Sequence, residues 1–343
     1  MSTQPLTSNR LDFDDSGDAL EHYFGRGWTD GLPVVPPTVE AVERFLEAAG
    51  RSPSEILGTE PVKGRVITAE KAAINAVMAG CRPEYFPVVV AAIEAVCEPE
   101  FNLHALSVST MGAAVFMVVG GPVAERLGIN SGVGAFGPGH RANATIGRAV
   151  RLIMSNVTGA VSGVLDKATL GHAAKYTWCV AEADDVRPWE PLRVQRGLSE
   201  DQSAVTVFAG LSPMQVANHE ARQPEGIFAS FLDAMFAAGP GQEEILVVLC
   251  PEHVGYIRSA GWSRQDVQNH FFEKAQRSVA DWAARGVDVG SADPDAMVAV
   301  AQSAESVTPI VAGGPAGAFS AVIALWAGGT GSRSVTREVR LPS

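Results

Sequence analysis

The alternation of apolar runs with amphipathic segments predicts strands and helices in turn along the chain. Apolar residues that recur at three- and four-residue spacing are typical of helices that bury one face. Short continuous apolar runs are typical of buried strands, and four stand out: residues 114–119, 205–208, 245–249 and 308–311. This order of elements predicts an α/β or mixed α+β fold.

Two early helices can be placed from the residues at their ends. Thr38 is the expected N-cap, and Gly50 the expected stop, of a helix that turns Val42 and Phe45 to one side. A second helix is expected over residues 69–79. Both should pack against the core.

Turns that end in proline follow four of the strand candidates, and two of these turns are almost identical. Residues 118–122 read VVGGP and residues 311–315 read VAGGP. In α/β sheets such turns lie at the carboxyl ends of strands, where ligands bind. The similarity of these two turns favours two pseudo-symmetric lobes with a cleft between them. The alternative is that strand–Gly–Pro–helix connections are common and arise without duplication. The expected division is a polar flexible arm (1–17), an N-terminal α/β lobe with a glycine-rich loop (18–200) and a C-terminal α/β lobe (201–343).

Composition and charge narrow the classes of function. The chain has 343 residues, of which 46% are hydrophobic and 19% charged, enough for a large buried core. Its 26 Lys and Arg against 38 Asp and Glu give a net charge of −12, which argues against nucleic acid and anionic membranes as partners. No apolar run reaches the roughly 20 residues of a membrane helix, and no secretion signal is evident. We expect a cytoplasmic protein with reduced cysteines that forms a homo-oligomer.

A glycine-rich loop over residues 128–139 carries the densest candidate chemistry. It leads into a helix over 144–156 whose expected N-cap is Asn143. Helix N-termini attract anions, and the glycines allow the backbone to approach a ligand closely. The spacing fits neither a phosphate loop nor a dinucleotide fingerprint, and a tightly turned structural loop is the alternative. The residues expected to hold a carboxylate or another small anionic or polar substrate are Asn130, Ser131, Arg141 and Asn143.

Cys81 is the expected nucleophile. It lies next to Arg82 and just ahead of a helix that Pro83 can begin, and both features lower the pKa of a thiol. The alternative is that Cys81 packs as a small apolar residue. Cys250 shares the geometry, with His253 following it, and is the second candidate.

Proton transfer is assigned to His104, which would act as acid or base if the fold brings it to Cys81. Lys175 is a further expected catalytic residue, and Glu182 could add charge to the same cleft, although a solvated pair is the alternative. The sequence has neither C-x-x-C nor H-E-x-x-H, so no metal site is expected and the cofactor is left open.

Several motifs are distinctive enough to compare with known families: WTDGLPVVPPT (28–38), NAVMAGCRPEY (75–85), GINSG (128–132), FGPG (136–139), RANATIGR (141–148) and SRSVTR (332–337). They resemble a bacterial family whose members accompany, or are fused to, UGSC-motif (seleno)proteins, and the resemblance extends from about Gly25 onward. It implies thiol or selenol chemistry, such as reductive or lytic cleavage of a carbon–heteroatom bond. This chain has no Cys-Gly-Ser-Cys sequence, so a UGSC-type partner would have to supply it.

The leading hypothesis is therefore a thiol-dependent oxidoreductase or lyase with Cys81 as thiolate and His104 as its proton-transfer partner. One alternative is a metal-assisted or cofactor-independent lyase or hydratase, in which Cys81 is structural or a metal ligand and His104, Lys175 or Glu182 transfers the proton. The other is a non-catalytic partner subunit of a UGSC-type (seleno)protein.

Overall fold

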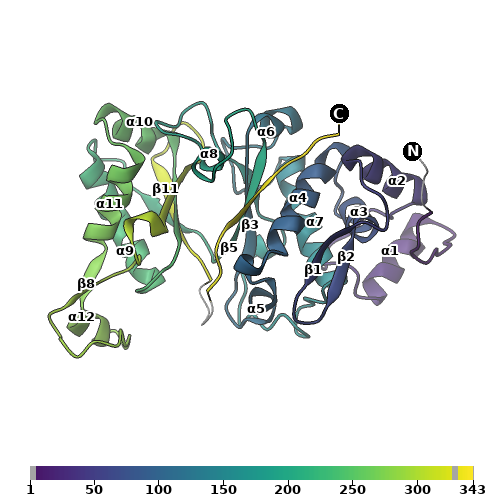
Figure 1. Ribbon diagram of the computed structural model, residues 1–343, viewed down its shortest axis with the longest axis horizontal. Helices are drawn as coiled ribbons and strands as arrows, with labels where there is room; N and C mark the ends of the chain where they lie inside the picture. Colours follow the sequence, from purple (N-terminus) through teal and green to yellow (C-terminus); the bar gives the residue numbers. More distant parts are fainter. Residues whose placement is uncertain (1–4, 327–330, 343) are drawn as a thin grey trace.

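Two four-stranded sheets face each other, and helices cover the outer face of each. The structure, a computed structural model, describes residues 5–326 and 331–342. Figure 1 shows the resulting layers from one end of the molecule to the other: helices, sheet, sheet, helices. The expected α/β fold is confirmed, with one parallel strand pair in each sheet.

The first sheet has the strand order β12-β5-β3-β4. Strand β3 pairs in parallel with β4 and antiparallel with β5, and β5 pairs antiparallel with β12. The apolar pattern located two of these strands correctly, because β3 and β5 are buried on both faces. The bounds are Ala114–Gly120 (β3), Cys179–Ala181 (β4), Ala204–Gly210 (β5) and Val335–Glu338 (β12).

The second sheet repeats this arrangement in the order β10-β7-β11-β6. Strand β7 pairs in parallel with β10 and antiparallel with β11, which pairs antiparallel with β6. Strands β3, β4, β5 and β12 thus correspond to β7, β10, β11 and β6. The bounds are Met214–Ala217 (β6), Ile245–Leu249 (β7), Val307–Val311 (β10) and Phe319–Ala324 (β11).

Each half of the chain contributes one strand to the sheet of the other half. Strand β6 follows β5 along the chain but lies in the second sheet, and β12 follows β11 but lies in the first. The crossing points are joined by two reciprocal hydrogen bonds, from Leu211 N to Ala324 O (2.9 Å) and from Trp326 N to Ala209 O (2.8 Å). The division between the sheets therefore does not coincide with the expected boundary at residue 200.

The similar turns at 118–122 and 311–315 do not mark equivalent places in this pattern. They follow β3 and β10, whereas the counterpart of β3 is β7. The two halves correspond in strand order and strand direction, and two similar five-residue turns do not predict either property.

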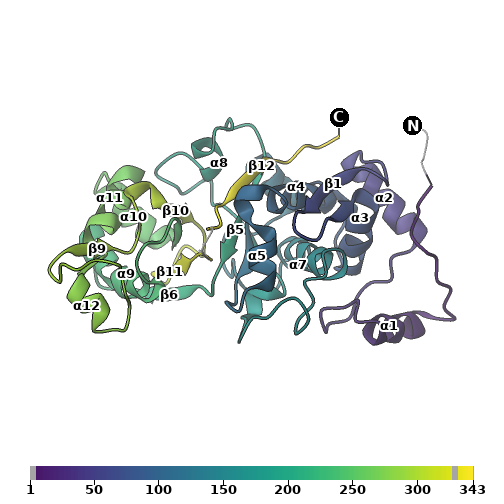
Figure 2. The same cartoon turned by 60° about the horizontal axis from the view of Figure 1, so that its bottom comes forward.

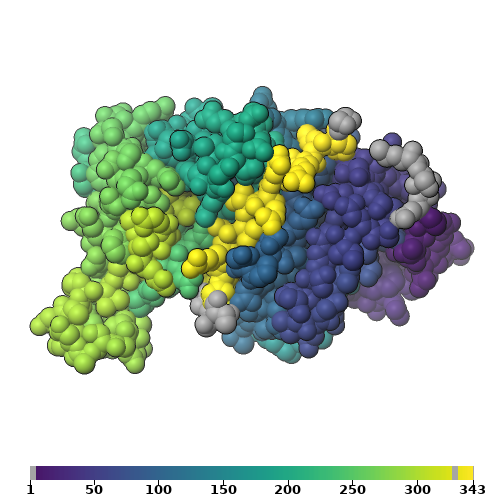
Figure 3. Space-filling model, viewed as in Figure 1, coloured from purple at the N-terminus to yellow at the C-terminus, as the bar shows by residue number. Residues whose placement is uncertain are grey.

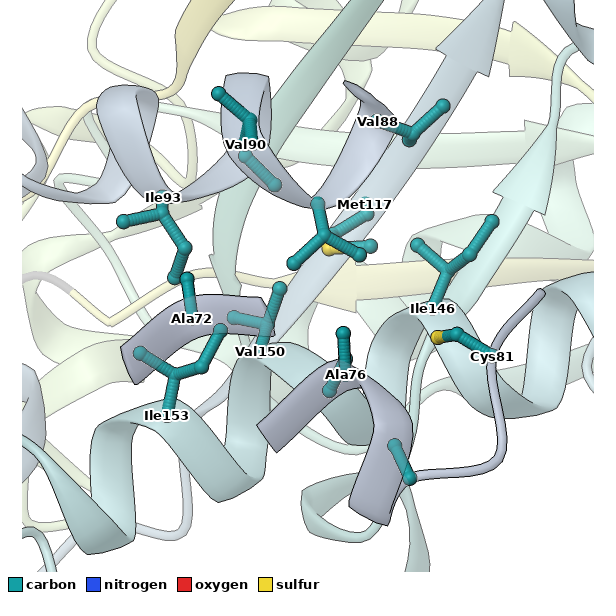
Figure 4. Packing of buried hydrophobic residues seen from close by; sticks show 14 of the residues in the cluster. Ala72, Ala76, Cys81, Val88, Val90, Ile93, Met117, Ile146, Val150 and Ile153 are labelled. Atoms are coloured by element: carbon teal, nitrogen blue, oxygen red, sulfur yellow. The ribbon is translucent and has the colours of Figure 1, made fainter. Parts of the chain in front are cut away.

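Alanine-rich helix packing covers the outer face of the first sheet. Ala72, Ala73 and Ala76 of α3 are fully buried, and their small side chains let α7 approach closely. Figure 4 shows this core, with α3 and α7 below a helix that carries Val90 and Ile93. The bounds on this side are Ser16–Gly25 (α1), Val39–Ala49 (α2), Ala69–Met78 (α3), Pro83–Tyr85 (η1), Phe86–Val96 (α4), Pro99–Phe101 (η2), Leu103–Val108 (α5), Pro122–Leu127 (α6) and Arg141–Asn156 (α7), with the hairpin Ile56–Glu60 (β1) and Arg65–Thr68 (β2).

Phe228, Phe231 and Phe271 are fully buried in the core on the outer face of the second sheet, where α9, α10 and α11 pack. The hairpin β8–β9 and α12 extend from this end of the molecule (Figure 1 and Figure 2). The bounds on this side are Pro224–Ala238 (α9), Pro251–Ser259 (α10), Arg264–Lys274 (α11), Gln276–Ser278 (β8), Val279–Ala283 (α12), Met297–Ala299 (β9) and Ala304–Ser306 (η4). Two short helices, Ala173–Lys175 (η3) and Leu192–Gln195 (α8), contact strands of the first sheet.

Helix α2 begins and ends at the capping residues that the sequence predicts. The Thr38 hydroxyl accepts a hydrogen bond from Ala41 N, and Gly50 ends the helix in the left-handed region with φ of 62°. An L side chain at that φ would be strained, so glycine is the natural stop.

The described part of the N-terminal arm is fixed to the first half of the chain. Thr7 and Ser8 donate backbone hydrogen bonds to the carboxylate of Glu70, which is buried on α3. The arm was expected to be flexible, but these contacts hold it. Figure 3 shows the C-terminal segment running diagonally across the surface of the same half. Among the described residues, no helix combines the length and apolarity needed to cross a membrane.

Successive side chains of a strand point to opposite faces of the sheet, so the strands contribute side chains to three separate cores. In β3, Phe116 and Val118 point between the sheets, whereas Met117 and Val119 point toward the helices. Ile323 of β11 enters the same layer between the sheets from the opposite side. This shared apolar layer holds the two halves together.

Removing side-chain volume from the shared layer should destabilise the whole protein. We expect Ile323→Ala, at a fully buried site, to lower the free energy of unfolding by about 2–5 kcal/mol in urea denaturation, because the transfer and cavity costs add. Leu170→Ala, at a side chain that is 96% exposed, is the control and should change it by less than about 0.5 kcal/mol. Equal effects of the two substitutions would contradict this account.

Candidate active site

The carboxyl ends of the parallel strands of both sheets meet at one edge of the molecule. Just beyond β4, Ala183 N donates to Val311 O at the end of β10 (2.8 Å). The helices that follow β3 and β7, α6 and α10, begin on the same side, the upper side of Figure 1. Ligands in α/β proteins bind preferentially at such an edge.

Cys250, His253 and Ser320 form a buried cluster at this edge. Cys250 directly follows β7 as the N-cap of α10, and His253 lies one turn into that helix. The Ser320 hydroxyl, from β11, accepts a hydrogen bond from Cys250 N (3.0 Å) and lies 2.8 Å from His253 Nδ1. The side chains are 3%, 0% and 5% exposed.

The orientation of the imidazole is fixed from its other side. His253 Nε2 lies 3.1 Å from the carbonyl oxygen of Asn218, after β6. A carbonyl oxygen can only accept a hydrogen bond, so Nε2 carries a proton. Nδ1 is then the nitrogen that exchanges a proton with the cysteine and serine.

Electrostatics favour the charged forms of both Cys250 and His253. Burial raises the pKa of the Cys250 thiol, but hydrogen bonds from the ring and backbone N–H of His253 and from Ser320 outweigh it and lower that pKa overall. Burial lowers the pKa of His253, but the hydrogen bonds to Cys250 and to the Asn218 carbonyl raise it overall. Each partner of this pair therefore shifts the other toward its charged form, as in the cysteine–histidine pairs that activate a thiol.

The loop between β10 and β11, next to Cys250, has a strained backbone. Ala318 has φ of 44°, in the left-handed region that non-glycine residues rarely adopt. The Glu252 carboxylate holds it there by accepting hydrogen bonds from Gly317 N (2.8 Å) and Ala318 N (3.1 Å). Glu252 precedes His253 on α10, so the same helix turn positions both the imidazole and the loop. Strain of this kind clusters at functional sites.

The glycine-rich loop reaches the Cys250 edge. Gly313 N, next to Cys250, donates to Ser131 O (2.7 Å). A Cβ on Gly314 would lie 3.0 Å from Val133 Cγ2, so glycine permits this close approach. Of the residues expected to bind substrate, Ser131 thus lies beside the Cys250 edge. Asn130 shapes the loop, since its side chain donates to Val133 O and accepts from Gly132 N.

Cys81 lies in the apolar core of the first half. Figure 4 shows its sulfur beside Ile146 and Ala76. Burial raises the pKa of this thiol to about 12, despite a hydrogen bond with the Thr145 side chain and the nearby charge of Arg141. The protonated Sγ also donates to Thr145 O (3.2 Å). The direction is opposite to the one expected from the helix start and Arg82, because the cost of burying a thiolate exceeds both stabilising effects.

Arg141 and Asn143 serve the backbone of the first half. The Arg141 guanidinium donates to Gly80 O (3.1 Å) and Cys81 O (3.4 Å). Asn143 was expected to cap α7, but the N-cap is His140, and the buried Asn143 amide donates to Asn130 O and Cys179 O. These bonds use the side chains that were expected to hold an anion.

His104 and Lys175 are engaged with carboxylates away from Cys81. His104 Nδ1 lies 2.8 Å from Glu60 Oε1 on β1, and Lys175 Nζ lies 2.7 Å from Asp166 Oδ2. No hydrogen bond joins either side chain to a cysteine in the part of the chain that the structure describes. The expected grouping of Cys81, His104 and Lys175 is therefore not assembled.

Glu182 is a second unusual group at the carboxyl edge, directly after β4. Burial, with a smaller contribution from Asp184, raises its pKa to about 7, although Leu192 N, Arg187 and Arg193 act in the opposite direction. Leu192 N donates to Oε2 (2.8 Å), while Oε1 has no partner within the described residues. A buried carboxyl with this pKa can exchange a proton near neutral pH.

Sequence analysis identified two of the three residues of the Cys250 cluster. The spacing of Cys250 and His253 across a helix start was visible, whereas Ser320 lies 70 residues away and carried no local signal. Within residues 5–326 and 331–342, no group of three or more His, Cys, Asp or Glu side chains is placed to hold a metal ion.

Comparison of the chain with protein-family models, curated proteins and solved structures found no match. The resemblance to the family that accompanies UGSC-motif (seleno)proteins therefore stays a prediction. Function must be argued from the geometry of the site.

The four cysteines should differ sharply in the pH dependence of alkylation. We expect the midpoint for Cys250 to lie below the free thiol value of about 8.5. Cys81 and Cys97, whose pKa burial raises to about 12, and Cys179, whose pKa burial also raises, should remain unmodified at pH 8. Iodoacetamide labelling followed by mass spectrometry measures this.

His253→Gln should move the Cys250 midpoint upward, because the imidazolium that stabilises the thiolate is lost. If Cys250 reacts only after denaturation, or its midpoint is the same in His253→Gln, the thiolate–imidazolium pair does not exist.

Glu182 should make stability depend on pH. Its pKa is about 7 in the folded state against an ordinary 4.5, so the folded protein binds more protons between these values. Its contribution is complete below pH 4.5 and is lost as the pH rises through 7. The free energy of unfolding of Glu182→Gln, relative to wild type, should therefore increase between pH 5 and pH 8, by up to about 3 kcal/mol. Glu200→Gln, at an exposed carboxylate after α8, is the matched control and should show no such increase.

Proposed function

We propose that this protein is a cytoplasmic, thiol-dependent enzyme that acts on a small polar or anionic substrate, with Cys250 as nucleophile and His253 as its proton-transfer partner. The observation that carries the proposal is the buried contact of Cys250, His253 and Ser320 at the carboxyl edge of the strands. A nucleophile, a base within hydrogen-bond reach and a group that orients the base are the parts that covalent catalysis requires. The proposal keeps the expected chemistry and moves it from Cys81 to Cys250.

The bond that such a site breaks is a carbon–heteroatom bond or a disulfide. The Cys250 thiolate would attack the electrophilic atom, the leaving atom would depart with the bonding electron pair, and the His253 imidazolium would supply its proton. Water, or a thiol in the redox case, would then release the product from sulfur. In the release step, the neutral imidazole would accept the proton of the attacking water or thiol.

Small anionic substrates suit the charge of this edge. The positive end of α10, a helix of nine residues, adds to the charge of the imidazolium. Cys250 is only 3% exposed, so little of this residue is accessible to a bulky substrate. Both facts favour a small molecule over a polymer.

A chromogenic ester tests the nucleophile without knowledge of the substrate. With p-nitrophenyl acetate we expect a burst of nitrophenolate that approaches one equivalent per chain, and an acetyl group on Cys250 by mass spectrometry. Cys250→Ser should abolish the burst, because a serine hydroxyl is not ionised at neutral pH, and Cys97→Ser is the matched control. A burst that survives in Cys250→Ser and disappears in Cys81→Ala would return the chemistry to Cys81.

Glu182 favours a second candidate function, a cofactor-independent lyase or hydratase. Its unpartnered Oε1 and pKa of about 7 suit a base that removes a proton from carbon. If this candidate is right, the enzyme exchanges substrate protons for deuterium in deuterated water. NMR measures this exchange for each member of a panel of small hydroxy and keto acids. Exchange that is lost in Glu182→Gln and kept in Cys250→Ser supports it; the reverse pattern supports the thiol enzyme.

A further inference from the structure

A small cavity lies beside α7, away from the carboxyl edge. It has a volume of about 20 Å³ and lies among Arg151 and Met154 of α7, the start of β3 at Ala114, and the segment 166–178. Ala114 begins β3, so the cavity is at the opposite end of this strand from the Cys250 cluster. It therefore has no part in the proposed reaction.

Two cations share one carboxylate in its wall. Lys175 Nζ lies 2.7 Å from Asp166 Oδ2 and 3.0 Å from Oδ1, and Arg151 Nη2 lies 3.2 Å from Oδ2. Burial raises the pKa of Asp166, but Lys175, Ala168 N and Arg151 outweigh it and lower that pKa overall, so the carboxylate is ionised. No other carboxylate lines the cavity among the described residues, which leaves one positive charge in excess.

The rest of the wall does not balance this charge. The hydroxyl of Ser107 donates to Leu103 O, and that of Thr177 donates to Ala144 O. The remaining side chains, among them those of Leu106, Met154 and Trp178, carry no charge. A cation beside apolar surface is costly unless a counter-charge accompanies it.

Lys175 and Arg151 have further N–H groups that can donate hydrogen bonds to an anion. The Lys175 ammonium has three N–H groups, and two of them suffice for the oxygens of Asp166. The Arg151 guanidinium has five, of which its contact with Asp166 uses one. Lys175 and Arg151 are 16% and 17% exposed, and neither has a buried nitrogen without a partner among the described residues, so an anion would replace water at these donors.

We propose that this cavity binds one small monovalent anion, of the size of chloride or bromide, between Lys175 and Arg151. About 10–15 Å³ suffices for one water molecule, so the volume admits a single-atom ion and excludes larger organic anions. The ion neutralises the excess charge and joins the segment 166–178 to α7. Its binding stabilises the folded protein, because the unfolded chain has no such site.

Anion-dependent thermal unfolding tests the proposal. At constant sodium concentration and ionic strength, replacing gluconate by bromide should raise Tm in a saturable manner, by a few degrees. Weakly hydrated bromide generally destabilises proteins compared with gluconate, so the sign separates site binding from a bulk salt effect. Lys175→Met should abolish the rise. Lys167→Met, at an exposed lysine of the same segment, should keep it.

A crystal soaked in bromide locates the ion directly. An anomalous peak within hydrogen-bond distance of Lys175 Nζ or Arg151 confirms the site and needs no variant, so the test holds even if Lys175→Met does not fold. Either of two results overturns the proposal: a cavity that holds only a water molecule, or a bromide-dependent rise in Tm that persists in Lys175→Met.

Discussion

The apolar layer between the two sheets is the interaction on which the rest of the structure depends. The inner strands of each sheet are buried on both faces, and helices cover only the outer face, so neither sheet excludes water from its inner face without the other. Phe116 and Phe208 from one side meet Leu246 and Ile323 from the other. This packing sets the parallel strand pairs side by side with their carboxyl ends at one edge, which brings loops from distant parts of the chain together.

The two halves share a strand pattern but differ in chemistry. Gly121 precedes α6 after β3, and Cys250 holds the corresponding place before α10 after β7. A Cβ at Gly121 would lie 2.4 Å from Gln202 O, so the first half has no room for a side chain there. In the second half the same position carries a thiol, with an imidazole one turn away. A repeated scaffold thus carries a reactive group at only one of its two equivalent positions.

Local patterns in the sequence were sufficient to predict helices and strands, but they did not identify all residues of the candidate active site. Strand β7 was located residue for residue from a continuous apolar run, and α2 from both of its caps, because these signals lie within a few residues of sequence. Cys81 was misjudged because a helix start and a neighbouring arginine are visible in sequence, whereas burial, which dominates the pKa, is not. The partner of Cys250 was missed because strand pairing, not chain proximity, brings Ser320 to it.

The exchange of β6 and β12 between the sheets has a consequence for how the chain is made. The edge of β5 that β12 covers stays unpaired until the ribosome has synthesised the second half and released Val335–Glu338. An open strand edge invites pairing with other chains, so the nascent first half is the species most prone to aggregate. Long-range closure of this kind also gives a high contact order, and the last step of folding is therefore expected to be slow.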